Sequence, residues 1–434
     1  MSNQNIQEII LTKSAFKKCI RYFRSNLPNE SLVFVFGKVV EKKGGRIVIA
    51  AYPIFPDEND YDTRSETSCR ISQEFMAREF SKHFKKGESL VLSWHSHPID
   101  CLSRKDEQAH LEMLKAYPNI FTGFYNRGNF EFFKYDDGFR KVKSKIIDMK
   151  IYDRQIRAFG YDAQFKLITS HVALIGCGGA AQLAYLLAEQ GIGKLTLIDP
   201  DTWDRTSLNR VWIPRSHVGM NKAESLAKLI RRWRNVEVDA FPYPIEDLPE
   251  NVLKDIDILV AMTDTFKSRI YVNRLAIDMK KPAVFGAAEI NAKNNRIERM
   301  VGECIVYVPN KTPCYECNLK VDPKQAMKES MDRKTWRKFA RKYGLSVDSP
   351  PVPSLANLNN IVVSLMSDEI LKIITGYAEP VHHQYWDHLK RKLFVVNAER
   401  NPECPACKEI GHVKIHESDL ITREEALSRG VEID

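Results

Sequence analysis

The chain has 434 residues, of which 44% are hydrophobic and 28% are charged, the composition of a globular protein with an ample core. At roughly 100–200 residues per domain, this length predicts two or three domains, and the composition excludes a collagen, a low-complexity chain and a disulfide-stapled miniprotein. The net charge of +9 is mild for a chain of this length, so it says little about partners, and nucleic acid is not expected as one.

The nine cysteines indicate a reducing compartment. Four of them form two Cys-x-x-Cys pairs, Cys314/Cys317 and Cys404/Cys407, and the other five are scattered. An odd total with two metal-type pairs is typical of a cytoplasmic protein rather than of a secreted disulfide framework. The first residues lack the features of a signal peptide, and we see no apolar run of about 18 residues, so a cytoplasmic location without a membrane partner is expected.

The first third of the chain shows an α+β pattern. Apolar periodicity and turn signals predict, in chain order, a helix at 7–26, a strand pair at 31–40 and 46–52, a helix at 72–85, an apolar strand at 89–94, a helix at 103–116 and a strand-rich stretch at 121–134. The charged segment 139–150 is the expected boundary, which divides the chain into domains at 1–145 and 150–434.

From His171 onward the pattern becomes α/β. Short buried strands alternate with helices, at 171–175, 180–190, 194–199, 221–234, 236–241, 257–262, 266–279 and 282–287. Such alternation predicts a doubly wound, mostly parallel sheet of the Rossmann type.

The segment from Trp94 to Asp106 contains the first set of metal-ligand residues. His95 and His97 are two apart, so on a strand both side chains project to the same face. Asp106 lies at the start of a predicted helix, for which Ser103 is the expected N-cap. Two imidazoles and one carboxylate leave an open position on zinc, the arrangement of a hydrolytic site. Such a site needs a general base, and Glu30 stands at the beginning of an apolar strand.

These residues resemble the JAMM (JAB/MPN) metalloprotease family, whose members cleave ubiquitin-like proteins after their tails. The family pattern matches Glu30, Gly37, His95-Ser-His97-Pro98, Ser103 and Asp106, although the loop between His97 and Asp106 is shorter than the usual form. The resemblance implies a catalytic Zn²⁺ bound by His95, His97 and Asp106. It also implies that Glu30 moves the water proton and that Ser103 polarises the scissile carbonyl.

A glycine-rich turn follows the strand at 171–175. Gly176, Gly178 and Gly179 allow a tight turn and bring backbone N–H groups close to phosphate at a helix N-terminus. The next strand ends at Asp199 and Asp201, where an acidic side chain can hold ribose hydroxyls. This pattern alone does not separate NAD from ATP.

The flanking motifs resemble the ThiF/MoeB/HesA superfamily of ubiquitin-activating-type adenylyltransferases. Six motifs occur in the family's order between about residue 150 and about residue 410: Tyr152–Arg157, Thr206–Arg210, Gly219–Lys222, Met262–Thr265 and the two Cys-x-x-Cys pairs. The resemblance implies ATP and Mg²⁺ as cofactors and a homodimer.

The same resemblance assigns roles to individual residues. It implies that the glycines, Asp199 and Asp201 bind the nucleotide, that Arg210 and Lys222 bind phosphates and that Asp264 holds Mg²⁺. It further implies that Arg154 reaches into the partner's ATP site. Ser207 and Val211 replace the family's usual Asn and Gln, which shortens or removes one phosphate contact, and Ala181 replaces the last glycine of the loop.

The cysteine pairs and the crossover segment between them carry two further expectations. By the resemblance, the four cysteines bind one structural Zn²⁺; disulfides are the alternative, and a reducing compartment argues against them. Residues 318–403 contain no cysteine, so the chain lacks a thioester nucleophile in that segment. Ser354 is a weak substitute. Residues 323–343 are basic and are expected to be helical.

Together the two halves predict a bifunctional enzyme that acts on a ubiquitin-like protein. The first half would cleave its tail, in maturation or deconjugation, and the second would adenylate the exposed carboxylate, with a separate conjugating enzyme or thiol acceptor taking the acyl group. One alternative is adenylation of a sulfur-carrier protein, a peptide or a small-molecule carboxylate in biosynthesis. Another is a non-catalytic binding scaffold. Sulfur metabolism and conjugation-based defence against phage are both compatible with such a fusion.

Overall fold

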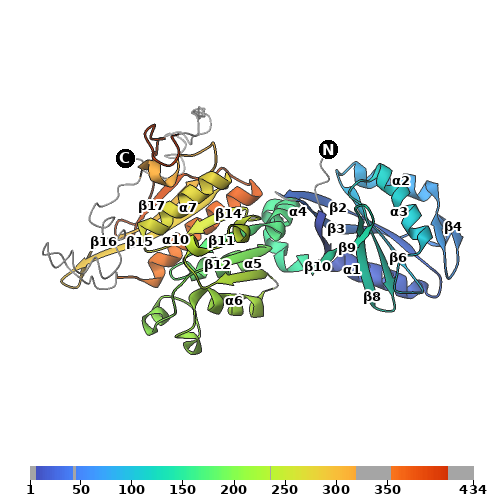
Figure 1. The fold of residues 1–434 in the computed structure, drawn as a ribbon, viewed down its shortest axis with the longest axis horizontal. Helices are drawn as coiled ribbons and strands as arrows, with labels where there is room; N and C mark the ends of the chain where they lie inside the picture. The colour runs from blue at the N-terminus through green and yellow to red at the C-terminus, as the bar shows by residue number, and fades with distance from the viewer. Residues whose placement is uncertain (1–5, 43–44, 235, 319–352, 409–434) are drawn as a thin grey trace. The chain divides into compact units, whose positions relative to one another are not determined.

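The computed structural model describes residues 6–42, 45–234, 236–318 and 353–408. The chain forms two compact units, Met1–Arg157 and Ala158–Asp434 (Figure 1). The predicted basic helix at 323–343 lies outside the described residues.

The first unit is built on one mixed eight-stranded sheet. Its strands have the order β10-β1-β3-β2-β6-β7-β8-β9. The bounds are β1 Ile6–Thr12, β2 Leu32–Lys42, β3 Gly45–Ile54, β6 Ser89–Ser96, β7 Phe121–Asn126, β8 Asn129–Tyr135, β9 Phe139–Lys141 and β10 Lys143–Ile147. A separate two-stranded sheet joins β4 Tyr61–Arg64 to β5 Cys69–Ile71.

Helices cover both faces of this sheet. α1 (Lys13–Asn26) buries Phe23 in one core, which includes Val33 and Trp94. α2 (Gln73–Phe84) and α3 (Arg104–Ala116) belong to the opposite face, where Phe80 packs with Phe36. The alternation of valines and phenylalanines along β2 produces the two cores, because successive strand residues point to opposite faces. Figure 1 shows α1 and the α2–α3 pair on opposite sides of the sheet.

The predicted helix at 7–26 is wrong in its first six residues. Residues Ile6–Thr12 form β1, which pairs in parallel with β3 and with β10. Ile9, Ile10 and Leu11 are almost completely buried. A fully buried run of this kind is typical of a central strand, and its pairing partners lie far away in the sequence, so local periodicity did not reveal it. Thr12 then caps α1 by accepting a hydrogen bond from the Ala15 N–H.

The charged segment 139–150 forms part of the first unit rather than a connection between units. It contains β9 and β10, and β10 lies at the sheet edge beside β1. The helix that follows, α4 (Asp153–Thr169), has a non-helical residue at Gly160.

The second unit has the predicted α/β architecture. Its sheet has the order β13-β12-β11-β14-β15-β16-β17-β18. The strands are β11 His171–Ile175, β12 Lys194–Ile198, β13 Glu237–Phe241, β14 Ile258–Ala261, β15 Ala283–Lys293, β16 Arg296–Tyr307, β17 His383–Asp387 and β18 Lys392–Val395. Pairing is parallel from β13 to β15 and antiparallel from β15 to β18.

Two layers of helices enclose this sheet. α5 (Ala181–Gln190), α6 (Lys222–Trp233) and α10 (Ala356–Thr375) share one core, and α7 (Phe266–Met279) packs in the core on the other face. Nearly all residues of the parallel strands β11, β12 and β14 are buried, as expected for strands covered on both faces. In the part of the chain that the structure describes, no helix is both long enough and apolar enough to cross a membrane.

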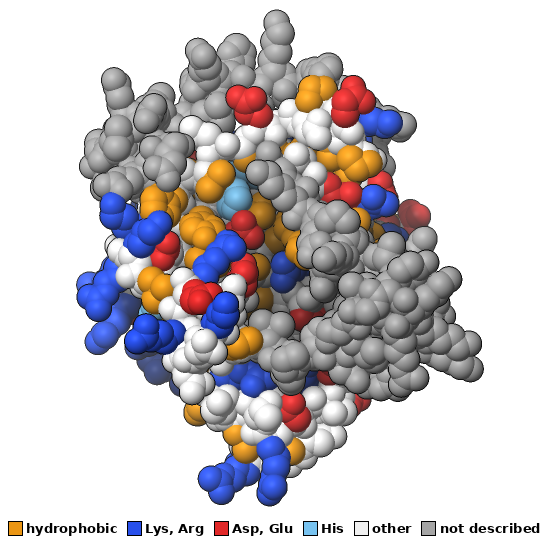
Figure 2. Space-filling model, turned by 90° about the vertical axis from the view of Figure 1, so that its left-hand side faces the viewer, with side chains coloured by type: hydrophobic (Ala, Val, Ile, Leu, Met, Phe, Trp, Pro, Cys, Tyr) orange, Lys and Arg blue, Asp and Glu red, His pale blue; other side chains and the backbone are white. Residues whose placement is uncertain are grey.

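Basic side chains are distributed rather than gathered on the face shown in Figure 2. Among the coloured residues there, Lys and Arg alternate with Asp, Glu and hydrophobic side chains. The net charge of +9 therefore does not form one uninterrupted basic patch on that face.

Candidate functional sites

The two histidines and the aspartate predicted to bind zinc come together in the first unit. His95 lies near the end of β6, His97 follows that strand, and Asp106 lies in the first turn of α3. Oxygens of Asp106 are 3.6 Å from His95 Nε2 and 3.4 Å from His97 Nε2. One ligand atom from each residue lies within 4.8 Å of the others.

The environment of these side chains fits a divalent metal. His95 is 4% exposed, and its Nε2 has no hydrogen-bond partner. A buried imidazole nitrogen without a partner carries a desolvation cost that a metal ion would remove. Ser103 and Asp106 form a capping box, in which the Ser103 N–H donates to Asp106 Oδ2 at 2.7 Å. This cap fixes the direction of the carboxylate. In this structure Ser103 is the N-cap of α3.

Glu30 is a buried acid beside this cluster. It lies two residues before β2 and is 6% exposed. Leu32 pairs with His95 across the sheet, so Glu30 comes just beyond the end of the strand that carries the histidine. Burial raises the pKa of Glu30 to about 7, an effect that the charge of His95 partly opposes. A carboxyl group with this pKa can accept and return a proton near neutral pH.

The four cysteines of the two Cys-x-x-Cys pairs form one buried cluster in the second unit. Sγ atoms are 3.7 Å apart in Cys314–Cys317, 3.6 Å in Cys314–Cys404 and 3.5 Å in Cys317–Cys407. None of the four forms a disulfide, and four thiolates at this spacing are the donor set of a structural zinc site. Hydrogen bonding from Cys314 lowers the pKa of Cys317. The sequence prediction that the two pairs meet is confirmed, and the zinc itself stays a prediction.

Asn273 organises the first cysteine pair, a role that sequence reasoning missed. It is completely buried on α7. Its Oδ1 accepts from the Tyr315 N–H at 3.0 Å, and its Nδ2 lies 3.6 Å from Cys314 Sγ and 3.0 Å from Glu316 Oε1. An asparagine in the middle of a helix gives no local signal of a partner about forty residues away.

The glycine-rich turn connects β11 to α5 at the edge where parallel strands end. Gly176 has a φ of +84°, and a Cβ there would lie 2.8 Å from the Met262 carbonyl oxygen. This position therefore requires glycine for both its backbone conformation and its close approach to the end of β14. If Gly178 carried a Cβ, the nearest atom to it would be Lys222 Nζ, at 3.8 Å. The loop and the predicted phosphate-binding lysine are thus neighbours.

Asp199 anchors the loop from the end of β12. Its carboxylate accepts from the Cys177 N–H at 2.7 Å and from the Asp201 N–H at 2.9 Å, and it is 4% exposed. Burial raises the pKa of Asp199, and the positive charge of Lys222 opposes this. A carboxylate has about four lone-pair positions, so two backbone bonds leave capacity for a ribose hydroxyl.

Lys222 begins α6 and faces both acids. Its Nζ is 2.8 Å from Asp201 Oδ2 and 4.0 Å from Asp199 Oδ1. Burial opposes its charge, but the carboxylates of Asp199 and Asp201 outweigh burial and raise the pKa of Lys222. Asn221, which sequence reasoning did not assign to the site, caps α6 and donates to the carbonyl oxygens of Asp199 and Asp201. These two hydrogen bonds hold the N-terminus of α6 against the segment that follows β12.

The other predicted residues are less closely joined to this group. Asp264 is exposed after β14, and its charge contributes to the raised pKa of Lys222. Arg210 folds back on its own turn and donates to the Thr206 carbonyl oxygen at 2.7 Å. Ser207 is buried, where its hydroxyl donates to Asp204. Arg154 is exposed on α4 and belongs to the first unit.

Comparison with known proteins shows the family to which the chain belongs. The model of the ThiF family matches residues 152–406, more than half of the chain. The chain belongs to the ThiF family. The His95–His97–Asp106 cluster lies outside the matched residues.

Individual relatives cover different shares of the chain. Adenylyltransferase and sulfurtransferase MOCS3 of Xenopus laevis is 31% identical over 239 residues, which are 53% of this chain and 47% of that protein. The sulfur carrier protein adenylyltransferase of Thermus thermophilus is 28% identical over 286 residues, 59% of this chain and 89% of that protein. This chain thus spans about half the length of MOCS3. The solved structure of E. coli MccB has a TM-score of 0.48 and 24% identity, and covers 71% of this chain and 80% of that one.

Proposed function

We propose that the second unit adenylates the C-terminal carboxylate of a ubiquitin-like or sulfur-carrier protein with ATP. In this reaction a carboxylate oxygen attacks the α-phosphorus, the bond between that phosphorus and the bridging oxygen breaks, and pyrophosphate leaves. Catalysis then consists mainly of positioning and charge neutralisation. The observation that carries the proposal is that Lys222 lies beside the glycine loop, with its Nζ 4.0 Å from Asp199 Oδ1.

Each residue of this group has a distinct task. Because the N–H groups of Gly176 and Cys177 donate to Ile198 and Asp199, it is the Gly178–Gly179 part of the loop, at the start of α5, that would offer backbone N–H groups to phosphate. Lys222 is held between Asp199 and Asp201 until ATP arrives, and its ammonium then neutralises developing charge on the phosphates. Asp264 would hold Mg²⁺, which supplies further charge neutralisation at the phosphates when bound.

ATP–pyrophosphate exchange with a carrier protein ending in a free glycine tests this proposal. Lys222→Ala should reduce exchange by about 100-fold or more, because removal of one preorganised charge typically costs that much. Lys228→Ala is the matched control, since this exposed lysine lies on the same helix. Equal exchange in both variants contradicts the proposal. Exchange with a peptide or a small carboxylate, but with no carrier, would favour the biosynthetic alternative, and no exchange at all would favour a binding scaffold.

The absence of cysteine from residues 318–403 defines the next step. A thioester on that segment cannot form, so the adenylate would pass to a separate conjugating enzyme or thiol acceptor. Ser354, the weak alternative nucleophile, accepts a hydrogen bond from Asn359 at 3.1 Å.

Arg154 would complete the ATP site of a second copy in a homodimer. Arg154→Ala should then lower exchange where Arg157→Ala does not, and mixing Arg154→Ala with Lys222→Ala chains should restore part of the activity.

A second function is favoured by the His95–His97–Asp106 cluster. We propose that the first unit is a zinc-dependent protease of the JAMM type that cleaves the tail of the same carrier. His95, His97 and Asp106 would hold Zn²⁺, which acidifies a bound water when present. Glu30 is the general base, because it is the buried carboxyl group beside the cluster. The observation that carries this proposal is the meeting of His95, His97 and Asp106, whose ligand atoms lie within 4.8 Å of one another.

Cleavage of a tail-extended carrier tests the protease. Glu30→Gln should abolish cleavage with zinc retained, and Glu112→Gln, an exposed acid on α3, should leave cleavage unchanged. Cleavage that survives Glu30→Gln, or that is absent from the zinc-loaded wild-type chain, contradicts the proposal.

A further inference from the structure

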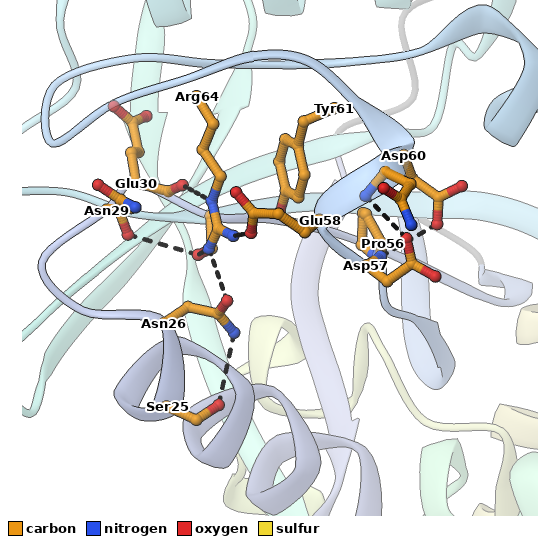
Figure 3. Close-up of polar contacts among 12 residues, drawn as sticks. Ser25, Asn26, Asn29, Glu30, Pro56, Asp57, Glu58, Asp60, Tyr61 and Arg64 are labelled. Carbon is orange, nitrogen blue, oxygen red and sulfur yellow. Dashed lines mark hydrogen bonds and ion pairs between the residues drawn. The ribbon is translucent and has the colours of Figure 1, made fainter.

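Arg64, a residue that the sequence analysis did not single out, lies in a buried polar network behind the candidate general base. It is the last residue of β4, and its side chain is 6% exposed. A buried guanidinium requires several acceptors, because its five N–H donors lose water on folding. Figure 3 shows where these acceptors come from: α1, the segment before β2, and the turn before β4.

The acceptors of Arg64 come from both sides of Glu30. Its Nε donates to the Glu30 carbonyl oxygen at 3.0 Å, and its Nη2 donates to Asn26 Oδ1 at 2.7 Å and to Ser31 Oγ at 2.6 Å. Its Nη1 forms an ion pair with Glu58. The guanidinium carbon also lies 4.6 Å from the centre of the Tyr61 ring.

The peptide groups of Glu30 are held from both directions. The Glu30 N–H donates to the Ser65 carbonyl oxygen at 2.8 Å, next to the bond from Arg64 to the Glu30 carbonyl. The Glu30 carboxylate points away from the guanidinium (Figure 3). Arg64 and Ser65 therefore hold the main chain and leave the carboxylate unpaired by arginine.

The same network reaches the strand of the metal ligands. The Ser31 N–H donates to Ser96 Oγ at 2.9 Å, and the Ser96 N–H donates to the Ser31 carbonyl oxygen at 2.8 Å. Ser96 stands between the two histidines. A chain of hydrogen bonds thus runs from Arg64 through Ser31 to the backbone that carries His95 and His97.

We propose that Arg64 is a positioning residue, which fixes the Glu30 backbone relative to the histidine strand and so holds the Glu30 carboxyl group beside the cluster that would bind the metal. This inference rests on the proposed protease function. A guanidinium suits the task better than an ammonium, because its planar fork engages four acceptors here in fixed directions. Arg64 acts through Glu30 and does not touch the substrate.

Steady-state cleavage by the zinc-loaded full chain tests this role. Arg64→Met should lower kcat by about 100-fold, with KM within about threefold of wild type, because a shift of about 1 Å in a catalytic group costs that much. Zinc content should remain that of the wild type. Arg64→Lys should recover part of kcat, and Ser31→Ala, which removes a single acceptor, should lower kcat less than Arg64→Met. Arg70→Met is the control, since that arginine is 76% exposed on the neighbouring strand.

The outcomes separate this inference from the function on which it rests. If wild type cleaves and Arg64→Met retains kcat, Arg64 is not a positioning residue although the protease proposal stands. If Arg64→Met does not fold, a wild-type kcat in Ser31→Ala and in Arg64→Lys overturns the inference. If wild type fails to cleave while zinc is bound, the protease proposal falls, and the role of Arg64 with it.

Discussion

At Gly176, the backbone has a φ of +84° and a Cβ would meet the Met262 carbonyl oxygen at 2.8 Å. Gly176→Ala should therefore cost about 2–4 kcal/mol of stability from unfavourable φ and overpacking, and should weaken ATP binding by moving the loop. Gly376→Ala is the matched control, because Gly376 also has a positive φ but has open space around it. Chemical denaturation and ATP titration measure both effects. Equal losses in the two variants would show that the close approach to β14 does not matter.

His171 is a second residue whose environment gives a measurable effect. It is buried beside Thr196, and burial lowers its pKa to about 4 from its usual 6.5. The unfolded chain then binds a proton at a higher pH than the folded chain does, so the free energy of unfolding falls as the pH drops from about 6.5 to about 4.

Urea unfolding at pH 7.5 and at pH 5 tests this effect. His171 should account for about 2 kcal/mol of the loss between these pH values, and His171→Gln should remove that part. An unchanged pH dependence in His171→Gln would show that this imidazole titrates normally in the folded chain.

At the scale of elements, α6 is both a stabilising element and a support for the nucleotide site. Asn221 accepts from the Glu224 N–H and donates to the carbonyl oxygens of Asp199 and Asp201. Asn221→Ala should cost about 1 kcal/mol for the lost cap, and should raise the KM for ATP because Lys222 follows directly.

Ser72→Ala separates these two consequences. Ser72 caps α2 in the first unit in the same way, so its loss should give a similar stability cost without a change in the KM for ATP. Thermal unfolding and pyrophosphate exchange measure the pair. If Asn221→Ala and Ser72→Ala have the same KM, the α6 cap does not support the nucleotide site.

The local sequence was sufficient for most of the elements. Buried strands such as β11 and capped helices such as α3 follow from short patterns, and both were predicted near their observed bounds. The strand β1 was not, since its partners β3 and β10 are distant in the sequence. The roles of Asn273 and Arg64 escaped for the same reason: both depend on contacts that form only after folding. The clustering of His95, His97 and Asp106 was foreseen from residue type and spacing, and that of the four cysteines from the family resemblance.

At the scale of the whole molecule, the two metal-type clusters belong to different units. We expect two zinc ions per chain, measured by elemental analysis of the protein purified without chelator. His95→Ala should lose one and leave pyrophosphate exchange intact. Cys404→Ser should lose the other and destabilise the second unit, because a four-thiolate zinc site contributes directly to folding. A chain that binds one zinc or none would contradict one or both assignments.

The central claim is that both units act in sequence on the tail of one carrier protein. The most direct measurement is ATP–pyrophosphate exchange with the same carrier in two forms, one ending in free glycine and one with a tail extension. The wild-type chain should support exchange with both forms, and Glu30→Gln should support it with the free-glycine form alone. The claim would be contradicted if Glu30→Gln supported pyrophosphate exchange with the tail-extended carrier. It would also be contradicted if the wild-type chain supported exchange with neither carrier.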